Sequence, residues 1–137
     1  MAGLDAFGTQ FLTGDGGSPE IFTPIANCTN VGGPETERAT HDVTAHDSPD
    51  GWREFIGGLK DGGEVSLELH YDPRDHDALY EHYEDSQPRT YRILWPEGLG
   101  GWQIKAVMTG FSSEAPFDDK LSAEVTFKVS GKPTLLV

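Results

Sequence analysis

Residues 64–71, EVSLELHY, decide the fold class of this chain. Every second side chain is apolar, from Val65 to Tyr71, and the residues between them are polar. Side chains of a β-strand point alternately to the two faces of a sheet, so this period of two gives one buried and one solvated face. The stretch therefore predicts a strand at the surface of an antiparallel sheet, with Ser66, Glu68 and His70 turned toward water.

The residues that follow, DPRD (72–75), carry the start signals of a helix. Asp72 suits the capping position, Pro73 suits the first helical position, and Asp75 adds negative charge near the positive end of the helix dipole. Apolar side chains then recur at three- and four-residue spacing, namely Ala78, Leu79, His82 and Tyr83. We therefore expect one short helix over about residues 73–85 that lies on the sheet.

Three further strands are predicted downstream. LSAEVTFKV (121–129) repeats the alternation of residues 64–71, with Phe127 among its inward side chains. Residues 89–95 and 102–111 have the same period, and the Pro- and Gly-containing segment 96–101 between them predicts a turn. Residues 89–111 are therefore expected to form a hairpin.

The first half of the chain gives weaker strand patterns. Residues 7–12 and 20–31 are candidates, but Pro24 cannot donate to a β-ladder and indicates an edge strand or an irregular segment. Residues 38–47 alternate with little apolar bulk, which predicts a partly exposed strand. The whole pattern is typical of one mainly β domain over residues 1–137, an antiparallel β-sandwich with a single short flanking α-helix.

Residues 47–63, DSPDGWREFIGGLKDGG, combine turn-forming Gly and Pro with large apolar side chains. Structureless loops of this length are uncommon in compact domains and are usually functional or disordered. Disorder does not account for the apolar side chains, whereas a groove on a partner would bury them. We therefore interpret the segment as a long docking arm between strands; the alternative is a loop folded back on its own core. The candidate contact residues are Asp47, Pro49, Asp50, Trp52, Arg53, Phe55, Ile56 and Leu59.

The five histidines and the many carboxylates form no catalytic or metal-binding pattern. His41 and His46 are five residues apart and would point to opposite faces of a strand, whereas zinc ligands occur in tighter pairs. The acidic run 72–77 lacks the Gly and the terminal Glu of a calcium loop. We find no nucleophile elbow and no glycine-rich phosphate loop. The sequence therefore predicts no enzyme activity, no cofactor and no metal.

The charge balance restricts the function further. The 137 residues contain 23 Asp and Glu against 10 Lys and Arg, giving a net charge of -13 and a pI of about 4.5. Domains that grip DNA neutralise phosphates with Lys and Arg and have a pI above roughly 9, so a nucleic-acid clamp is excluded. Apolar runs fall far short of the roughly 20 residues that cross a bilayer. The first ten residues lack the form of a secretory signal, and the single cysteine, Cys28, fits a reducing cytosol.

Three segments resemble major tail tube proteins of long-tailed, siphovirus-type bacteriophages. They are FTPIANCTN (22–30), THDVTAHDSPDGWREFIGGLKDGGEVSLELHYDP (40–73) and LSAEVTFKVSGKPTL (121–135). The most specific feature is their order: DSPDGWRE, then GLKDGGEVSLELHYDP, then a short helix and a closing SGKPT. Together these segments span most of the chain.

The resemblance implies a β-sandwich of the tail-tube type and a structural role in the virion. Six copies would form a ring, and rings would stack into the tail tube that conducts DNA during ejection into the host. The long loop, here about residues 40–60, would reach toward the adjacent ring. The implied partners are other copies of the chain, a tape measure protein, a tail terminator, and distal tail or baseplate proteins. Assembly would take place in the host cytoplasm.

The polar faces of the predicted strands are candidates for the lumen or for the outer wall, and the sequence leaves both open. They comprise Ser66, Glu68, His70, Gln103 and Lys105. Six copies would carry six times -13, or -78, so DNA would pass through the lumen without specific binding. The competing interpretation is a monomeric β-sandwich module that recognises carbohydrate or protein, with Trp52, Trp95 or Trp102 stacking on the ligand.

Overall fold

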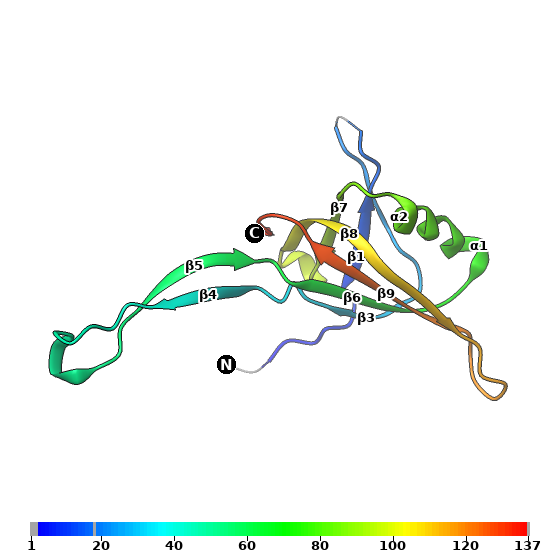
Figure 1. Ribbon diagram of the computed structural model, residues 1–137. Coiled ribbons are helices and arrows are strands. Elements are labelled where there is room, and N and C mark those ends of the chain that lie inside the picture. The colour runs from blue at the N-terminus through cyan, green and yellow to red at the C-terminus, as the bar shows by residue number, and fades with distance from the viewer. Residues whose placement is uncertain (1–2, 18, 137) are drawn as a thin grey trace.

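The computed structural model describes residues 3–17 and 19–136 and consists mainly of antiparallel strands (Figure 1). Eight of them are β1 (Gln10–Gly14), β2 (Phe22–Pro24), β3 (Cys28–Gly32), β6 (Glu64–His70), β7 (Arg89–Leu94), β8 (Gly101–Glu114), β9 (Ser122–Val129) and β10 (Thr134–Leu136). They form one sheet in the order β2-β1-β7-β8-β9-β6-β3, and β10 pairs with β8. The predicted mainly β, antiparallel architecture is therefore confirmed.

The strand β6 has the two faces that its sequence predicts. Val65, Leu67 and Leu69 are buried, whereas Glu68 and His70 are exposed. The strand pairs along its whole length with β9, which places Leu67 opposite the buried Val125. Each strand thus contributes an alternating apolar row to the same side of the sheet, which is the physical reason for their pairing.

Aromatic side chains from distant strands meet in the core. Phe127 of β9 lies 5.3 Å from Phe11 of β1 and 4.7 Å from Tyr91 of β7, measured between ring centroids. All three are almost completely buried. Because β1 and β9 are three places apart in the strand order, the sheet curves over and its two halves enclose the core, as in a sandwich.

The predicted hairpin over residues 89–111 is confirmed. Ile93 of β7 faces Trp102 of β8, and a short 3-10 turn, η3 (Pro96–Gly98), joins the two strands. β8 is 14 residues long and pairs with β7 over its first part and with β9 over its second. It is therefore the strand that connects the two halves of the sheet.

The helical segment begins as predicted and consists of α1 (Pro73–His76), a 3-10 turn η2 (Asp77–Leu79) and α2 (Tyr80–Glu84). The carboxylate of Asp72 accepts a hydrogen bond from the Arg74 N–H at 3.0 Å, which satisfies one free donor of the first turn. The predicted apolar stripe is partly wrong. Ala78 and Tyr83 are exposed, and the residues buried on this side are Leu79 and His76.

In the first half of the chain, the strand boundaries differ from those that the sequence predicts. β1 starts at Gln10, and the expected strand over residues 20–31 is divided into β2 and β3. The division follows Pro24, which lacks an N–H donor, and includes Asn27, whose φ of 63° is incompatible with a strand. Within the described residues, no helix has the length and apolar character needed to span a membrane.

Candidate assembly surfaces

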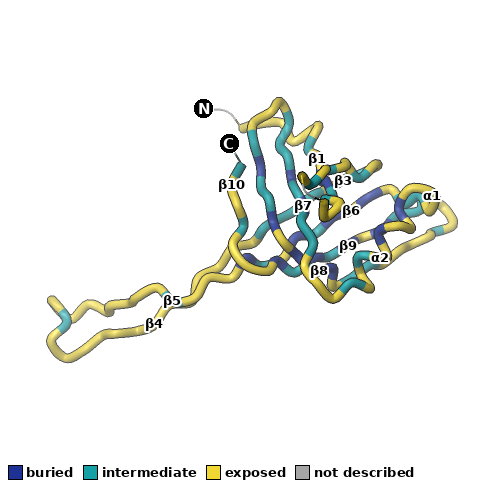
Figure 2. Tube along the Cα trace, turned by 90° about the horizontal axis from the view of Figure 1, so that it is seen from above, coloured by how far each residue is buried: buried dark blue, intermediate teal, exposed yellow. Residues whose placement is uncertain are grey.

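The strands β4 (Glu37–Asp42) and β5 (Phe55–Asp61) form a separate antiparallel ribbon that projects from the body (Figure 1). We call residues 37–61 the arm and residues 43–54 the arm tip. All of β4 and nearly all of β5 are exposed (Figure 2). The arm therefore has no core of its own, and it contributes little to the core of the body.

The arm tip is held together by local hydrogen bonds. The Ser48 hydroxyl accepts from the Ala45 N–H at 2.9 Å and donates to the Glu54 carboxylate at 2.8 Å. The Glu54 N–H in turn donates to the Thr44 hydroxyl at 2.8 Å. A 3-10 turn, η1 (Pro49–Gly51), reverses the chain. These hydrogen bonds give the tip a defined shape, with the polar side chains of Thr44, Ser48 and Glu54 bonded within it.

An ion pair between Arg53 and Asp42 closes the tip where it joins the ribbon. Hydrogen bonds from the hydroxyl and the N–H of Thr44, followed by the Arg53 guanidinium, hold the pKa of the Asp42 carboxyl below its usual value. Arg53 also lies over the Phe55 ring, 5.7 Å from its centroid. Asp42 and Arg53 are therefore paired with each other within the arm. Asp47 and Asp50 are exposed.

The arm differs from the loop without regular structure that the sequence suggested. Phe55, Ile56 and Leu59 lie on β5, and Asp47, Pro49, Asp50, Trp52 and Arg53 lie at the tip. The structure brings all eight candidate residues onto one projection but not onto one face. Phe55 and Ile56 are neighbours on a strand and point to opposite sides of the ribbon.

The apolar side chains of the arm are exposed in the isolated subunit. Trp52 is 74% exposed and Leu59 is 89% exposed, and Phe55 and Ile56 are each 54% exposed. The alternative of a loop folded back on its own core is therefore wrong. Exposed apolar residues collected on a projection are typical of a contact with another molecule.

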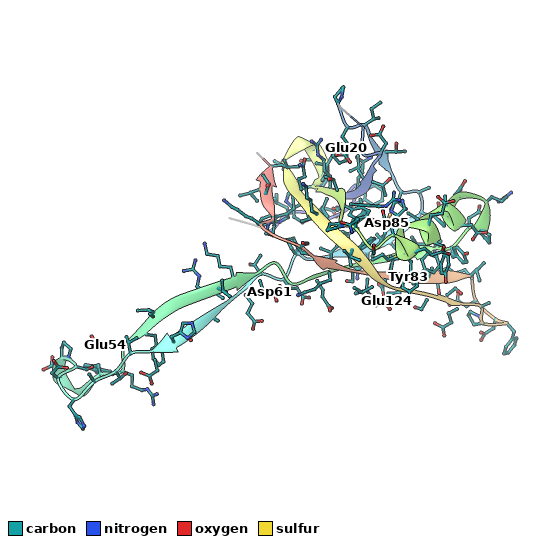
Figure 3. The ribbon with its side chains drawn as sticks, turned by 45° about the horizontal axis from the view of Figure 1, so that its top comes forward. Glu20, Glu54, Asp61, Tyr83, Asp85 and Glu124 are labelled. Carbon is teal, nitrogen blue, oxygen red and sulfur yellow. The ribbon has the colours of Figure 1, made fainter. Side chains whose placement is uncertain are left out.

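The candidate polar residues of β6 lie in a row on the outer face of the sheet. Ser66, Glu68 and His70 stand opposite Thr126, Glu124 and Ser122 of β9. The Asn30 side chain of β3 donates a hydrogen bond to the Glu68 carboxylate at 3.1 Å. This row forms a polar surface across β3, β6 and β9, and Figure 3 labels Glu124 on it.

The structure does not bring Gln103 and Lys105 into that row. Both are in the first half of β8, opposite Arg92 and Thr90 of β7, whereas β8 pairs with β9 only from Ala106 onward. The Gln103 side chain accepts a hydrogen bond from the Arg92 guanidinium at 2.9 Å. The five residues therefore belong to two separate polar areas.

A groove lies where the arm meets the body, and we call it the basal groove. Its volume is about 1060 Å³, and its lining includes Arg38, Leu59, Lys60, Val129, Lys132 and Pro133. Nearby, Lys128 donates to the Asp61 carboxylate at 2.9 Å, which is the main reason why the pKa of Asp61 is lowered. Figure 3 labels Asp61 at this junction. The cations that line the basal groove, Arg38, Lys60 and Lys132, come from three separated segments. Sequence spacing therefore gave no signal for this groove.

Sequence reasoning also missed a second hollow, beneath the N-terminal segment. It has a volume of about 840 Å³ and is lined by apolar groups that include Leu4, Phe7, Val31, Trp95 and Leu99. Phe7 is 89% exposed, and Phe117, between β8 and β9, is fully exposed. Isolated aromatic residues in turns carry no periodicity, so their exposure could not be predicted.

No group of three or more His, Cys, Asp or Glu side chains in the described part of the chain is arranged to hold a metal ion. Burial raises the pKa of the Cys28 thiol and that of the Tyr91 hydroxyl, so both groups stay protonated at neutral pH.

A mainly β body with a projecting arm that exposes apolar side chains is typical of proteins that act through contacts with other molecules. The family model described as "Lambda phage tail tube protein, TTP" matches residues 7–136. This chain belongs to that family. It is a structural protein of the phage tail tube and a component of the virion, and its family is not one of enzymes. No curated protein sequence matches the chain.

Solved structures share the fold. A chain from the tail of an empty gene transfer agent particle, refined with C6 symmetry, has a TM-score of 0.81 and 18% identity and covers 98% of this chain and 100% of its own. A chain from the native gene transfer agent virion has a TM-score of 0.71 and 20% identity, with coverages of 92% and 95%. A chain from the sheath/tube terminator of an extracellular contractile injection system has a TM-score of 0.73 and 14% identity, with coverages of 100% and 99%.

Proposed function

We propose that six copies of this chain close into a ring and that the rings stack into a tube through which phage DNA leaves the capsid. The observation that carries the proposal is the arm, which exposes Trp52, Phe55, Ile56 and Leu59 on a member of the tail tube family. Ring formation is supported by the C6 symmetry of the gene transfer agent tail that shares the fold. The proposed self-assembly needs no further chain within the tube wall.

Contacts within a ring would use the ends of the main sheet. β2 and β3 end the strand order among the described residues. Strand edges offer free backbone N–H and C=O groups, so they pair readily with another chain. A heterologous contact, in which the β3 edge of one copy meets a different surface of the next, closes into a ring when the rotation between copies is 60°.

Contacts between rings would use the arm. The arm would lie against a copy in the adjacent ring. Its contact residues would be Asp47, Pro49, Asp50, Trp52 and Arg53 at the tip, with Phe55, Ile56 and Leu59 on β5. Burying large apolar side chains at such a contact contributes about 1.5–3 kcal/mol each. Six arms at each junction between two rings would multiply this contribution, so the tube is expected to persist at low subunit concentration.

The lumen would be acidic and polar. Both polar areas of the sheet are candidates for the lumen or the outer wall. One contains Ser66, Glu68 and His70, and the other contains Gln103 and Lys105. With a charge of about -78 per ring, the tube would confine DNA without releasing its counterions, so DNA would move freely. The partners at the tube ends would be a tail terminator and distal tail or baseplate proteins, and a tape measure protein would fill the lumen before ejection.

Replacing the arm tip tests this proposal. The variant substitutes Asn-Gly for residues 43–54, so a two-residue turn joins Asp42 to Phe55, which already face one another. The body is expected to keep its thermal unfolding temperature, because the removed residues lie outside the core. The variant is expected to form no tubes under conditions where the unmodified chain forms them, as seen by negative-stain electron microscopy.

A control variant separates the arm from general surface effects. Exchanging the exposed Phe117 for Ser removes a large apolar side chain outside the arm, and tubes should still form. Normal tubes from the Asn-Gly variant would contradict the role of the arm. A chain that stays monomeric at every concentration and binds a glycan array would instead favour the carbohydrate or protein recognition module.

A further inference from the structure

The basal groove is a positive site on a strongly acidic chain. The chain carries a net charge of -13, yet Arg38, Lys60 and Lys132 come together at this groove. All three side chains are exposed. Within residues 3–17 and 19–136 none of them forms an ion pair. The lining also contains two acidic residues, Glu37 and Asp61, and Asp61 is paired with Lys128. The groove therefore has a small net positive charge and presents three cations that an incoming acidic group could pair with.

The arm tip is the acidic counterpart of this groove. The arm tip, residues 43–54, contains Asp47, Asp50 and Glu54 against Arg53, so its net charge is one minus three, or -2. Asp42 is already paired with Arg53, whereas Asp47 and Asp50 are exposed and stand on either side of Pro49 at the outermost turn. The two carboxylates most available to a partner are therefore at the end of the arm.

The reach of the arm is of the same order as the length of the body. If extended, the 11 residues from Arg38 to Pro49 would span at most roughly 36 Å at about 3.3 Å per residue. The 14 residues of β8 extend roughly 46 Å at the same rise. The arm projects away from the body (Figure 1), so copies repeated along the direction of the arm would bring the tip of one toward the base of the arm on the next. The tip cannot reach its own groove, since the paired strands of the ribbon separate them.

We propose that the arm tip of each copy docks in the basal groove of a second copy in the adjacent ring. This inference rests on the proposed function and names the receiving surface. Asp47 and Asp50 pair with Arg38, Lys60 and Lys132, while Trp52 lies against the apolar part of the groove. That part is supplied by Leu59, Val129 and Pro133. The contact is heterologous, so it does not close on itself and repeats from ring to ring along the tube.

Charge reversal on each side tests the pairing. The groove variant carries Lys60→Glu and Lys132→Glu, the tip variant carries Asp47→Lys and Asp50→Lys, and a third chain carries all four changes. Each two-site variant places like charges together and is expected to raise the subunit concentration needed for assembly about tenfold or more. The four-site chain restores opposite charges and is expected to assemble near the original concentration. Assembly is measured by light scattering and by sedimentation velocity.

A matched control reverses charges away from the arm. The chain with Glu84→Lys on α2 and Lys120→Glu near the β8–β9 turn changes two exposed residues and should assemble normally. If either arm variant also assembles normally, or if the four-site chain assembles no better than the two-site variants, the inference is wrong. In that case tubes formed by the unmodified chain would still support the proposed function.

Disulfide trapping tests the contact without requiring a complete tube. The chain with Asp50→Cys and Lys132→Cys, oxidised at high concentration, is expected to give a ladder of covalent oligomers, because every copy offers one tip and one groove. The chain with Glu84→Cys and Lys132→Cys is the control and is expected to give no such ladder. Equal products from both chains would overturn the inference. A ladder from a chain that never forms tubes would support the tip-to-groove contact and contradict the tube.

Discussion

The buried His76 and the half-buried His82 attach the helical segment to the rest of the fold through hydrogen bonds. His76 accepts from the Asp72 N–H at 2.9 Å through Nδ1, and its Nε2 lies 2.8 Å from the Ala26 carbonyl oxygen. His82 lies 2.8 Å from the Tyr91 hydroxyl. At His76, a neutral ring with its proton on Nε2 satisfies both nitrogens and their partners. These residues thus fix the helix at two points about a turn and a half apart.

The environment of His82 makes folding sensitive to acid. Burial, followed by the positive charge of Arg89, lowers its pKa below 6.5. The folded state therefore binds fewer protons than the unfolded state, and the free energy of unfolding falls as pH drops through 6.5. Urea unfolding at pH 7.5 and at pH 5.5 is expected to show lower stability at the acidic pH.

The variant His82→Gln isolates this effect. Glutamine does not titrate, so the difference in stability between the two pH values should be smaller than for the unmodified chain. The aspartates with lowered pKa values, such as Asp61 and Asp85, titrate below this interval and do not contribute. An unchanged pH dependence in His82→Gln would show that another group is responsible.

For single residues, the sequence predicted the structural role correctly where that role depends on neighbours in the chain. Asp72 and Pro73 mark the helix start by their own chemistry, and the structure has the helix there. The role of His76 could not be predicted, because its partner Ala26 is 50 residues away. The buried side of the helix was misjudged for the same reason: spacing selects Ala78 and Tyr83, but the position of the sheet selects His76.

Among the elements, the arm is joined to the body at one compact junction. Gly62 and Gly63 connect β5 to β6, and the Asp61 carboxylate accepts a hydrogen bond from the Gly63 N–H at 2.8 Å. The φ of Gly63 is 74°, and a Cβ built there would lie 2.0 Å from the Glu35 carbonyl oxygen. Only glycine fits this position, because the two strands of the arm leave the body side by side.

The substitution Gly63→Ala is expected to destabilise this junction. The left-handed backbone alone costs about 1–2 kcal/mol for alanine, and the contact with Glu35 forces the backbone to move. Gly131→Ala is the matched control, since its φ is 81° but a Cβ there meets no atom within 4 Å. Thermal unfolding should show a clearly larger loss for Gly63→Ala; equal losses would mean that the close contact relaxes without cost.

The elements with one buried and one exposed face were predictable, and the order of the strands was not. β6, β9 and the β7–β8 hairpin follow from alternation and turn residues within each segment. Alternation does not reveal that β9 lies between β8 and β6, because that depends on contacts between distant segments. The strand expected over residues 38–47 is present as β4, which is shorter and fully exposed. Its partner β5 escaped prediction because it has no buried face, so its sequence lacks the pattern that reveals a strand.

On the scale of the whole molecule, the charge decides how the protein meets DNA. The ten cations are divided among several surfaces, and three of the five described ion pairs involve an arginine with an aspartate. Binding to DNA depends on cations that displace counterions from the phosphates. A chain of charge -13 offers too few of them in one place, so strong binding to a duplex is not expected.

Fluorescence anisotropy with a labelled 30-base-pair duplex checks this expectation. The subunit and the assembled tube should both leave the anisotropy unchanged at roughly 50 mM salt, where electrostatic binding is strong. A duplex titrated with a basic protein of similar size provides the positive control. Micromolar binding that weakens with added salt would contradict a lumen that DNA crosses freely.

The place of β9 in the sheet also determines when the chain can finish folding. β9 lies between β8 and β6, and in the described part of the chain only β10 is synthesised after it. Until residues 122–129 have left the ribosome, β8 and β6 each keep an unpaired edge, and the core lacks the buried side chains of β9. The sheet is therefore completed only after β9 has been synthesised, and a ribosome that stops before Ser122 releases a product prone to aggregation.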